Sequence, residues 1–228
     1  MDKYAFEAII FDHDGTLVDT ESADFRAYQM LYTEFGATLN LEYWAATIVG
    51  RMNGYDDLFA ELARQSNNGV TAAGLWRRIR ELWLVTLEDV ELMPGVTTLL
   101  PTLQAAGYPL AVATASDQDW TRRWLTRFEL LPYFQTIATR NEVVHNKPAP
   151  DVYLLAAAQL GVDPGRCLVF EDSLAGVQSA TAAGMTVVAV PNHLTRVLDF
   201  SQAHAMLNSL EEVTLDWLEA LALTKRPP

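Results

Sequence analysis

The sequence contains little cysteine and no long apolar run, and each scarcity excludes a class of protein. A single cysteine, Cys167, among 228 residues excludes a disulfide framework within the chain and fits a reducing compartment. Because Cys167 stands in an apolar run, we interpret it as a small buried hydrophobe rather than a reactive thiol. The apolar runs are too short and too interrupted to cross a bilayer, so we expect no membrane partner.

Positive charge is also scarce. The chain has 16 Lys and Arg against 29 Asp and Glu, which gives a formal net charge of −13. A nucleic acid or an anionic membrane surface would require a basic patch, so we expect neither as a partner. Residues 1–4 lead into the first apolar run without the features of a signal peptide. We therefore expect a cytoplasmic protein. As a separate expectation, we take it to be a monomer or a weak homo-oligomer.

Hydrophobic periodicity divides the chain into two regions. Between about residues 21 and 88 the apolar residues recur at helical spacing, and no strand is predicted there. The rest of the chain alternates helices with short apolar strands, which is typical of a parallel sheet. Strands are expected at 5–11, 110–113, 136–139, 167–170 and 186–190, and helices near 95–106, 120–128, 152–160 and 174–183.

This pattern predicts an α/β fold with an inserted helical region. A Rossmann-like parallel-sheet core would comprise residues 1–17 and 92–228, and an α-helical cap domain would comprise residues 18–91. The expected hinges are 17–20 and 91–95. A cap in this position could close over a site at the end of the first strand and exclude water from it.

Two carboxylates follow the first predicted strand. The run Ala8-Ile9-Ile10 leads into Phe11-Asp12-His13-Asp14-Gly15-Thr16, so Asp12 and Asp14 stand one residue apart where a buried strand meets a loop. Ligands of open α/β sheets bind beyond the carboxyl ends of strands. One carboxylate there can attack phosphorus while the other passes a proton to the leaving oxygen, although Asp and Gly after a strand also form ordinary turns. Three later elements favour the chemical interpretation.

Groups suited to holding a phosphate appear in two of these elements. The strand 110–113 ends at Thr114-Ala115-Ser116, where the Thr114 hydroxyl could bond a phosphoryl oxygen. The backbone N–H groups that open the next helix could hold the other oxygens. In Asn146-Lys147-Pro148-Ala149-Pro150-Asp151, two prolines stiffen the backbone around Lys147, which would add positive charge on the phosphoryl side.

The third element supplies two more acids, Glu171 and Asp172, after the strand 167–170. If these acids shared one crevice with Asp12 and Asp14, the four carboxylates would repel one another and any phosphate dianion. We therefore expect a bound cation. Hard oxygen ligands without a His or Cys cluster favour Mg²⁺.

Four ordered motifs resemble those of the haloacid dehalogenase superfamily, subgroup IA, which includes sugar phosphatases and β-phosphoglucomutase. The motifs are FDHDGTLVDT, ATAS, KPAPD and FEDSLAG, and the resemblance covers nearly the whole chain. It implies a nucleophile and an acid/base at Asp12 and Asp14, respectively. It also implies phosphate-binding residues Thr114, Ala115, Ser116 and Lys147, and Mg²⁺ held by Asp12, the Asp14 backbone carbonyl and Asp172, joined by Glu171 in the closest relatives. Dehalogenase members lack the second aspartate, so the presence of Asp14 favours phosphoryl chemistry.

Two positions differ from the mutases of this subgroup. Asp24 stands where they have a cap histidine that helps to exclude water from the phosphoenzyme, and Asp117 stands where they have a lysine. Both departures count against a mutase. We expect His13 to point away from the crevice if the strand pleat continues, and we interpret it as structural.

The predicted cap offers two candidate substrate contacts, Glu21 and Arg51. Arg51 follows a glycine and precedes a loop, so it could meet an anionic substrate group or lie in solvent. For Trp44, Trp76 and Trp83 we favour core packing over substrate stacking.

Three functions remain open from the sequence. The favoured one is a magnesium-dependent phosphatase that acts on a small, sugar-derived phosphomonoester through an aspartyl-phosphate intermediate. The alternatives are a β-phosphoglucomutase-like hexose phosphate mutase and a binding protein that kept the fold and lost turnover. The expected partner is a small phosphorylated metabolite.

Overall fold

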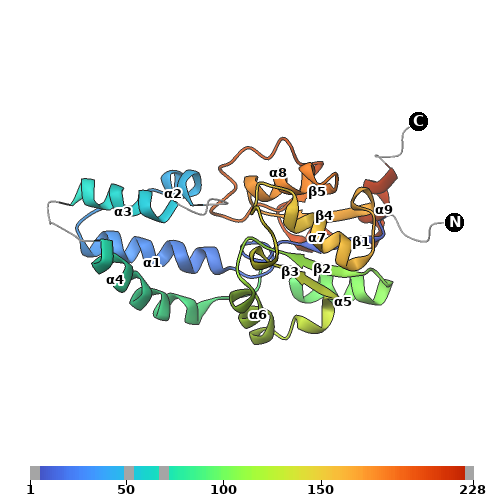
Figure 1. The fold of residues 1–228 in the computed structure, drawn as a ribbon, viewed down its shortest axis with the longest axis horizontal. Coiled ribbons are helices and arrows are strands. Elements are labelled where there is room, and N and C mark those ends of the chain that lie inside the picture. Colours follow the sequence, from blue (N-terminus) through green and yellow to red (C-terminus); the bar gives the residue numbers. More distant parts are fainter. Residues whose placement is uncertain (1–5, 49–53, 67–71, 224–228) are drawn as a thin grey trace.

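The computed structural model describes residues 6–48, 54–66 and 72–223, and within these ranges the strands form one parallel sheet (Figure 1). The strand order is β3-β2-β1-β4-β5-β6. The strands are β1 (Ala8–Phe11), β2 (Leu110–Ala113), β3 (Thr136–Ala138), β4 (Cys167–Glu171), β5 (Thr186–Ala189) and β6 (Ala205–Met206).

The central strand β1 determines where the carboxyl ends of the strands meet. Phe11 pairs with Val112 of β2 on one side and with Phe170 of β4 on the other. The residues that follow these three strands therefore lie at the same edge of the sheet. The chain order also changes direction at β1, and such a switch point opens the crevice in which ligands of α/β sheets bind.

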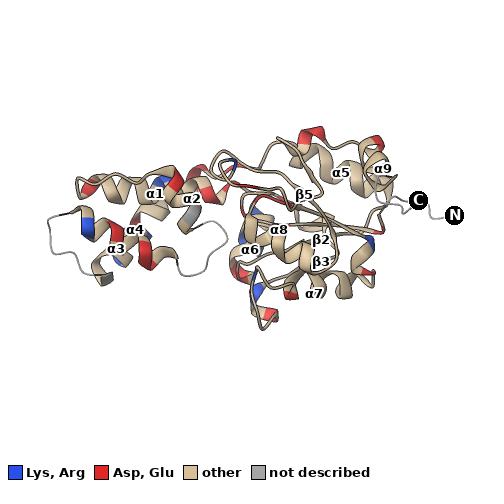
Figure 2. Cartoon of the chain, turned by 90° about the horizontal axis from the view of Figure 1, so that it is seen from above, with Lys and Arg blue, Asp and Glu red and all other residues tan. Residues whose placement is uncertain are grey.

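Helices cover both faces of the sheet, because successive strand side chains point to opposite faces. Ile9 and Phe11 pack with α5 (Val96–Ala106), α6 (Gln118–Arg127) and α9 (Leu215–Leu223). Ile10 packs on the other face with α7 (Asp151–Leu160) and α8 (Leu174–Ala182). Figure 2 shows α5 and α9 on one side of the strands and α7 on the other. It also shows acidic residues at both ends of the molecule.

The helices between β1 and α5 form a separate part of the molecule with its own apolar core. They are α1 (Thr20–Glu34), α2 (Leu41–Thr47), α3 (Gly54–Gln65) and α4 (Ala72–Thr86). Tyr28, Leu31, Leu58 and Ile79 are fully buried among them. Figure 1 shows these four helices at the opposite end of the molecule from α9. We call them the helical segment.

Two connections and one loop join the helical segment to the sheet. Val18 and Leu92 form an antiparallel bridge, flanked by hydrogen bonds from Asp19 N to Glu91 O at 2.9 Å and from Met93 N to Leu17 O at 3.0 Å. The loop after β5 also reaches the helical segment.

In that loop, Leu194 is fully buried in the apolar core of the helical segment, and Leu198 packs against both this core and the core beside α7 and α8. Leu198 therefore connects the apolar core of the helical segment with the core on the α7 and α8 face of the sheet.

The predicted fold class is confirmed, and most predicted elements agree with the structure to within a few residues. The strand 110–113 and the helix near 95–106 are found almost as predicted. The sequence pattern did not indicate β6 or α9. Within the described ranges, no helix is both long enough and apolar enough to span a membrane.

Candidate active site

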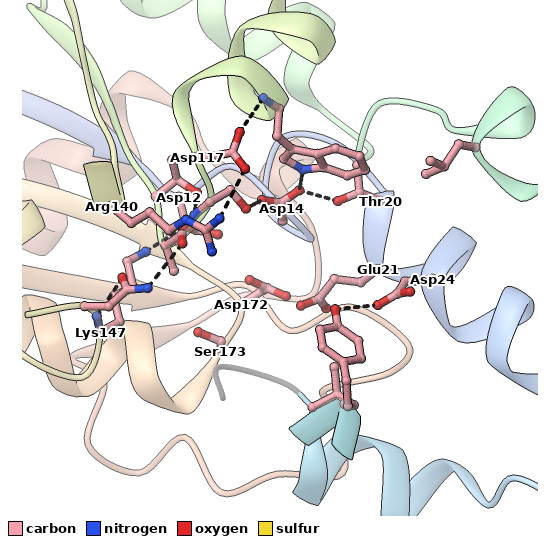
Figure 3. A pocket seen from close by; sticks show the side chains of 18 of the residues that line it. Asp12, Asp14, Thr20, Glu21, Asp24, Asp117, Arg140, Lys147, Asp172 and Ser173 are labelled. Carbon is pink, nitrogen blue, oxygen red and sulfur yellow. Dashed lines mark hydrogen bonds and ion pairs between the residues drawn. The ribbon is translucent and has the colours of Figure 1, made fainter. Parts of the chain in front are cut away.

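A cavity of about 570 Å³ lies where the carboxyl ends of the strands face the helical segment (Figure 3). Its volume is within the usual range for a small-molecule site. The sheet side contributes Asp12, Asp14, Thr114, Ala115, Ser116, Asp117, Trp120, Arg140, Asn146, Lys147, Asp172 and Ser173. The helical side contributes Thr20, Glu21, Asp24, Trp44, Ile48, Tyr55 and Trp83, with Leu87 from the following turn.

Asp12 and Lys147 form a buried ion pair at the base of this cavity. Lys147 Nζ donates to Asp12 Oδ1 at 2.5 Å, to Glu171 Oε1 at 2.7 Å and to the Ala113 carbonyl at 3.0 Å. Burial raises the pKa of Asp12 to about 7, although the charge of Lys147 opposes this shift. Burial alone would lower the pKa of Lys147, but Asp12 and Glu171 outweigh it and raise that pKa. Lys147 is therefore a fixed positive charge beside Asp12.

Asp14 lies in a different environment, surrounded by hydrogen-bond donors. Its Oδ1 accepts from Thr20 Oγ1 at 2.5 Å and from Trp120 Nε1 at 2.8 Å, and its Oδ2 accepts from Ser116 Oγ at 2.6 Å. His13 Nδ1 lies 3.2 Å from Oδ2. Burial alone would raise the pKa of Asp14, but His13 and the hydroxyl donors outweigh it and hold that pKa below its usual range.

Three buried carboxylates could hold a metal ion. One oxygen each from Asp12, Glu171 and Asp172 lie within 4.8 Å of one another. Burial raises the pKa of Asp172 well above its usual range, and Glu21, Glu171 and Asp12 raise it further. A hard divalent cation would relieve this repulsion and has the oxygen ligands that it prefers. The residues present therefore fit Mg²⁺.

Gly15 leaves the space that Asp172 occupies. Gly15 has φ +78°, and a Cβ atom added there would lie 2.2 Å from Asp172 Oδ2. Asp172 is held by Thr16 Oγ1, 3.2 Å from its Oδ1, and by Asn192 Nδ2, 2.8 Å from its Oδ2. The glycine after the two aspartates is thus needed for the close approach of the carboxylate that follows β4.

Glu171 is more tightly held than the other two acids. Its Oε1 accepts from Lys147 Nζ and, at 2.9 Å, from Tyr153 OH, and its Oε2 accepts from the Ser173 backbone N at 2.9 Å and from Ser173 Oγ at 3.0 Å. These donors orient Glu171 toward Lys147 as well as toward the possible metal position.

The four predicted phosphate-binding residues all line the cavity. Thr114 is 1% exposed, and its Oγ1 accepts a hydrogen bond from the Ser116 N–H at 3.0 Å. The Ser116 hydroxyl donates to Asp14 Oδ2. Ala115 and Lys147 complete this side of the cavity.

The helical segment brings one of its two predicted substrate contacts to the site. Glu21 lines the cavity and its Oε2 accepts from Asn192 Nδ2 at 3.2 Å, so Asn192 bridges Glu21 and Asp172. Burial raises the pKa of Glu21 to about 8, although the Asn192 bond opposes this shift. Arg51 lies outside the described residues.

Some residues at the site were not anticipated from the sequence. Trp120 and Arg140 line the cavity, and Asn192, which bonds Glu21 and Asp172, lies in the loop that follows β5. Extending the strand-end rule from the residue that directly follows each strand to the loop beyond it would have pointed to Asn192. His13 is buried and is not among the cavity-lining residues, but it contacts Asp14.

Two of the three tryptophans that are predicted to pack in the core also face the cavity. Trp44 is 1% exposed and packs against Phe25, and Trp76 packs edge-to-face on Phe59. Trp44 also lines the cavity, as does Trp83.

Known proteins resemble this chain over most of its length. The profile of the family described as haloacid dehalogenase-like hydrolase matches residues 9–190. Protein CbbY of Rhodobacter capsulatus is 35% identical over 86% of this chain and 90% of its own length, and hexitol phosphatase B of Escherichia coli K12 is 32% identical over 91% and 94%. A crystal structure of a HAD family hydrolase from Deinococcus radiodurans R1, with bound phosphate and sodium, has a TM-score of 0.79 at 30% identity and covers 96% of this chain and 97% of that one. The resemblance indicated by the four motifs is confirmed, and the chain belongs to the haloacid dehalogenase-like hydrolase family.

Proposed function

We propose that this chain is a magnesium-dependent phosphatase that hydrolyses small, sugar-derived phosphomonoesters through an aspartyl-phosphate on Asp12. The observation that carries the proposal is the contrast between two neighbouring carboxyl groups in one cavity. Lys147 contacts Asp12, whereas hydroxyl and indole donors surround Asp14. Carboxyl groups with such different surroundings are suited to different roles, here a nucleophile and an acid/base.

The reaction has two displacement steps. In the first, a carboxylate oxygen of Asp12 attacks phosphorus, the bond between phosphorus and the ester oxygen breaks, and Asp14 gives a proton to the departing oxygen. In the second, water attacks the phosphorus of the aspartyl-phosphate and Asp14 accepts its proton. Inorganic phosphate leaves and the Asp12 carboxylate is restored.

Asp14 takes up its proton when the substrate binds. The donors around Asp14 favour its anion in the free enzyme. A phosphate dianion beside it adds negative charge, which raises a carboxyl pKa. The proton needed in the first step is thus gained with the substrate, and the donors then stabilise the anion that this step leaves behind.

The remaining residues bind the phosphoryl group or the metal. Lys147, Thr114, Ala115 and Ser116 face the phosphoryl oxygens. Asp12, Asp172 and the Asp14 carbonyl would hold Mg²⁺, with Glu171 beside them. When bound, Mg²⁺ supplies positive charge that neutralises the phosphoryl oxygens and favours the ionised form of Asp12.

The helical segment is proposed to act as a cap, in which Glu21 and Arg51 contact the part of the substrate that is not phosphate. Its residues form one wall of the cavity. A wall of this kind excludes water and contacts the leaving group. The name of hexitol phosphatase B supports a polyol or sugar phosphate as the substrate class.

Release of inorganic phosphate from a panel of sugar and polyol phosphates, with and without Mg²⁺, tests the proposal. We expect Mg²⁺-dependent release that Asp12→Asn abolishes and that Asp14→Asn reduces by at least about 100-fold, since general acid–base catalysis typically contributes 10²–10⁴-fold. The exposed Asp119 offers a matched control, because Asp119→Asn makes the same chemical change outside the cavity. Undiminished release of inorganic phosphate by Asp12→Asn would refute the assignment of Asp12 as the nucleophile. Conversion of a hexose 1-phosphate primed by its bisphosphate, without phosphate release, would show a mutase instead.

A further inference from the structure

The cavity wall that the helical segment forms contains a carboxylate with an unusual set of partners. Asp24 projects from α1 toward the cavity (Figure 3). Its Oδ1 accepts a hydrogen bond from Trp83 Nε1 of α4 at 2.6 Å, and its Oδ2 accepts one from Tyr55 OH of α3 at 2.9 Å. Asp24 thereby joins three helices at the surface that faces the substrate.

Both partners of Asp24 are neutral donors. Across the described ranges, Asp24 forms no salt bridge, so these two hydrogen bonds are the protein contacts that stabilise its negative charge there. A carboxylate has about four acceptor positions, two on each oxygen. The bond from the Trp83 indole occupies one position on Oδ1, and the bond from the Tyr55 phenol occupies one position on Oδ2. Each oxygen can therefore accept a further hydrogen bond from a group in the cavity.

The surroundings of Asp24 make those further bonds favourable. Burial raises the pKa of Asp24 to about 6, and the Trp83 and Tyr55 bonds oppose this shift. At neutral pH the group is still ionised, and partial burial removes some of its hydration. Hydrogen bonds to a partly desolvated carboxylate are stronger than those between neutral groups.

The chemistry of the wall selects the type of leaving group. A hydroxyl group can donate to Asp24, whereas a second phosphate or a carboxylate placed there would be repelled. Aromatic side chains of Trp44, Tyr55, Trp83 and Trp120 also line the cavity and can cover the apolar C–H faces of a carbohydrate.

We infer that Asp24 is a specificity-determining residue that accepts hydrogen bonds from hydroxyl groups of the substrate's alcohol portion, so that the preferred substrates are phosphate esters of polyhydroxylated alcohols. This inference rests on the proposed phosphatase function. It goes beyond that function because it assigns the recognition of the leaving group to one residue of the helical segment.

Kinetic comparison of two kinds of substrate tests the inference. The hydroxylated substrates are sorbitol 6-phosphate and fructose 1-phosphate, and the reference is p-nitrophenyl phosphate, which has no hydroxyl group to donate. For Asp24→Asn we expect kcat/KM to fall about 10- to 100-fold on the hydroxylated substrates, mainly through KM, which matches the loss of a hydrogen bond to a charged group. On p-nitrophenyl phosphate we expect a change of less than about 3-fold.

Two controls separate recognition from structure. Asp56 is an exposed acid on α3, and Asp56→Asn changes the net charge of the helical segment equally, without touching the cavity. Its kinetics should match the wild type on both kinds of substrate. If Asp24 serves only to join the helices, Asp24→Asn will lower both activities in parallel together with the melting temperature, and the inference is wrong.

A measurement on the unchanged protein makes the test independent of folding of the variant. A site built to bond a hydroxyl group discriminates strongly against an analogue that lacks it. Wild-type kcat/KM for sorbitol 6-phosphate should therefore exceed that for hexyl phosphate by at least about 100-fold. Equal values would overturn the inference while leaving the phosphatase function intact, and failure of the wild type to hydrolyse any of these esters would overturn the proposed function itself.

Discussion

Replacing Lys147 by methionine should strongly destabilise the protein when no metal is bound. Lys147 is 8% exposed and its Nζ lies 2.5 Å from Asp12 Oδ1 and 2.7 Å from Glu171 Oε1. Methionine retains most of the volume but removes the only cation that pairs with these two carboxylates in the described part of the chain. The variant would then bury two like charges without a cationic partner.

The expected loss can be worked out from the cost of breaking a buried ion pair. Removing one partner of such a pair costs about 3–5 kcal/mol. For a chain of this size each kcal/mol shifts the melting temperature by about 2–4 °C, so Lys147→Met should lower it by about 6–20 °C. The larger values apply if both carboxylates stay ionised, and the smaller values apply if one takes up a proton.

Arg78 provides a matched comparison for this experiment. Its guanidinium also contacts two carboxylates, Glu34 and Glu81, each at 2.6 Å, but its side chain is 42% exposed. Surface ion pairs contribute little to stability, so Arg78→Met should shift the melting temperature much less.

The assay is thermal and urea unfolding of both variants in the presence of a chelator, because Mg²⁺ would partly replace the lost lysine charge. Equal shifts for Lys147→Met and Arg78→Met would refute the reasoning, since they would show that burial of the charges adds nothing to the cost.

Three further predictions concern the metal, the glycine beside it and the acid of the helical segment. Removal of divalent cations should abolish phosphate release, and added Mg²⁺ should restore it and raise the melting temperature, because the ion binds only the folded arrangement of carboxylates; a melting temperature that does not respond to Mg²⁺ would contradict the proposed site. Gly15→Ala should abolish Mg²⁺-dependent activity, since its Cβ would displace Asp172, whereas Gly36→Ala, at a similar φ of +69° but with nothing within 4 Å, should cost only about 1–2 kcal/mol of stability and leave activity unchanged. Burial raises the pKa of Asp24 to about 6; the Trp83 and Tyr55 bonds oppose this shift and the charge of Asp14 adds to it, so Asp24 loses its charge as the pH falls through 6. KM for sorbitol 6-phosphate should therefore rise below pH 6 relative to KM for p-nitrophenyl phosphate, and parallel pH profiles would exclude this dependence.

The sheet could be predicted from the sequence because its strands are short apolar runs that alternate with helices. The strand that contains Val169, for example, is buried on both faces and reads as a continuous apolar segment. β6 was missed because it contains two residues, one of them exposed, and so has no detectable pattern. α9 lies after the last recognised motif and buries few residues, which leaves only a weak helical signal.

The proposed site was predictable where its residues follow strands directly. Asp12, Thr114 and Asp172 belong to this class, and the register of β1 with its two neighbours brings them together. Contacts that depend on how helices pack were not predictable. The bond from Trp120 to Asp14 spans 106 positions of sequence and requires the angle between α6 and β1, which no local pattern encodes.

The shared burial of Leu194 and Leu198 bears on how this molecule could be rebuilt from parts of its relatives. A chimaera that exchanged only the helices between β1 and α5 would bring a foreign apolar surface against Leu194, whose side chain completes the core of those helices from the far end of the chain. A mismatch there would leave a void or a clash in the interior, and either costs stability. A successful graft would therefore need two pieces of donor sequence, the helices themselves and the loop 192–198. Variation in the one is expected to be accompanied by compensating variation in the other.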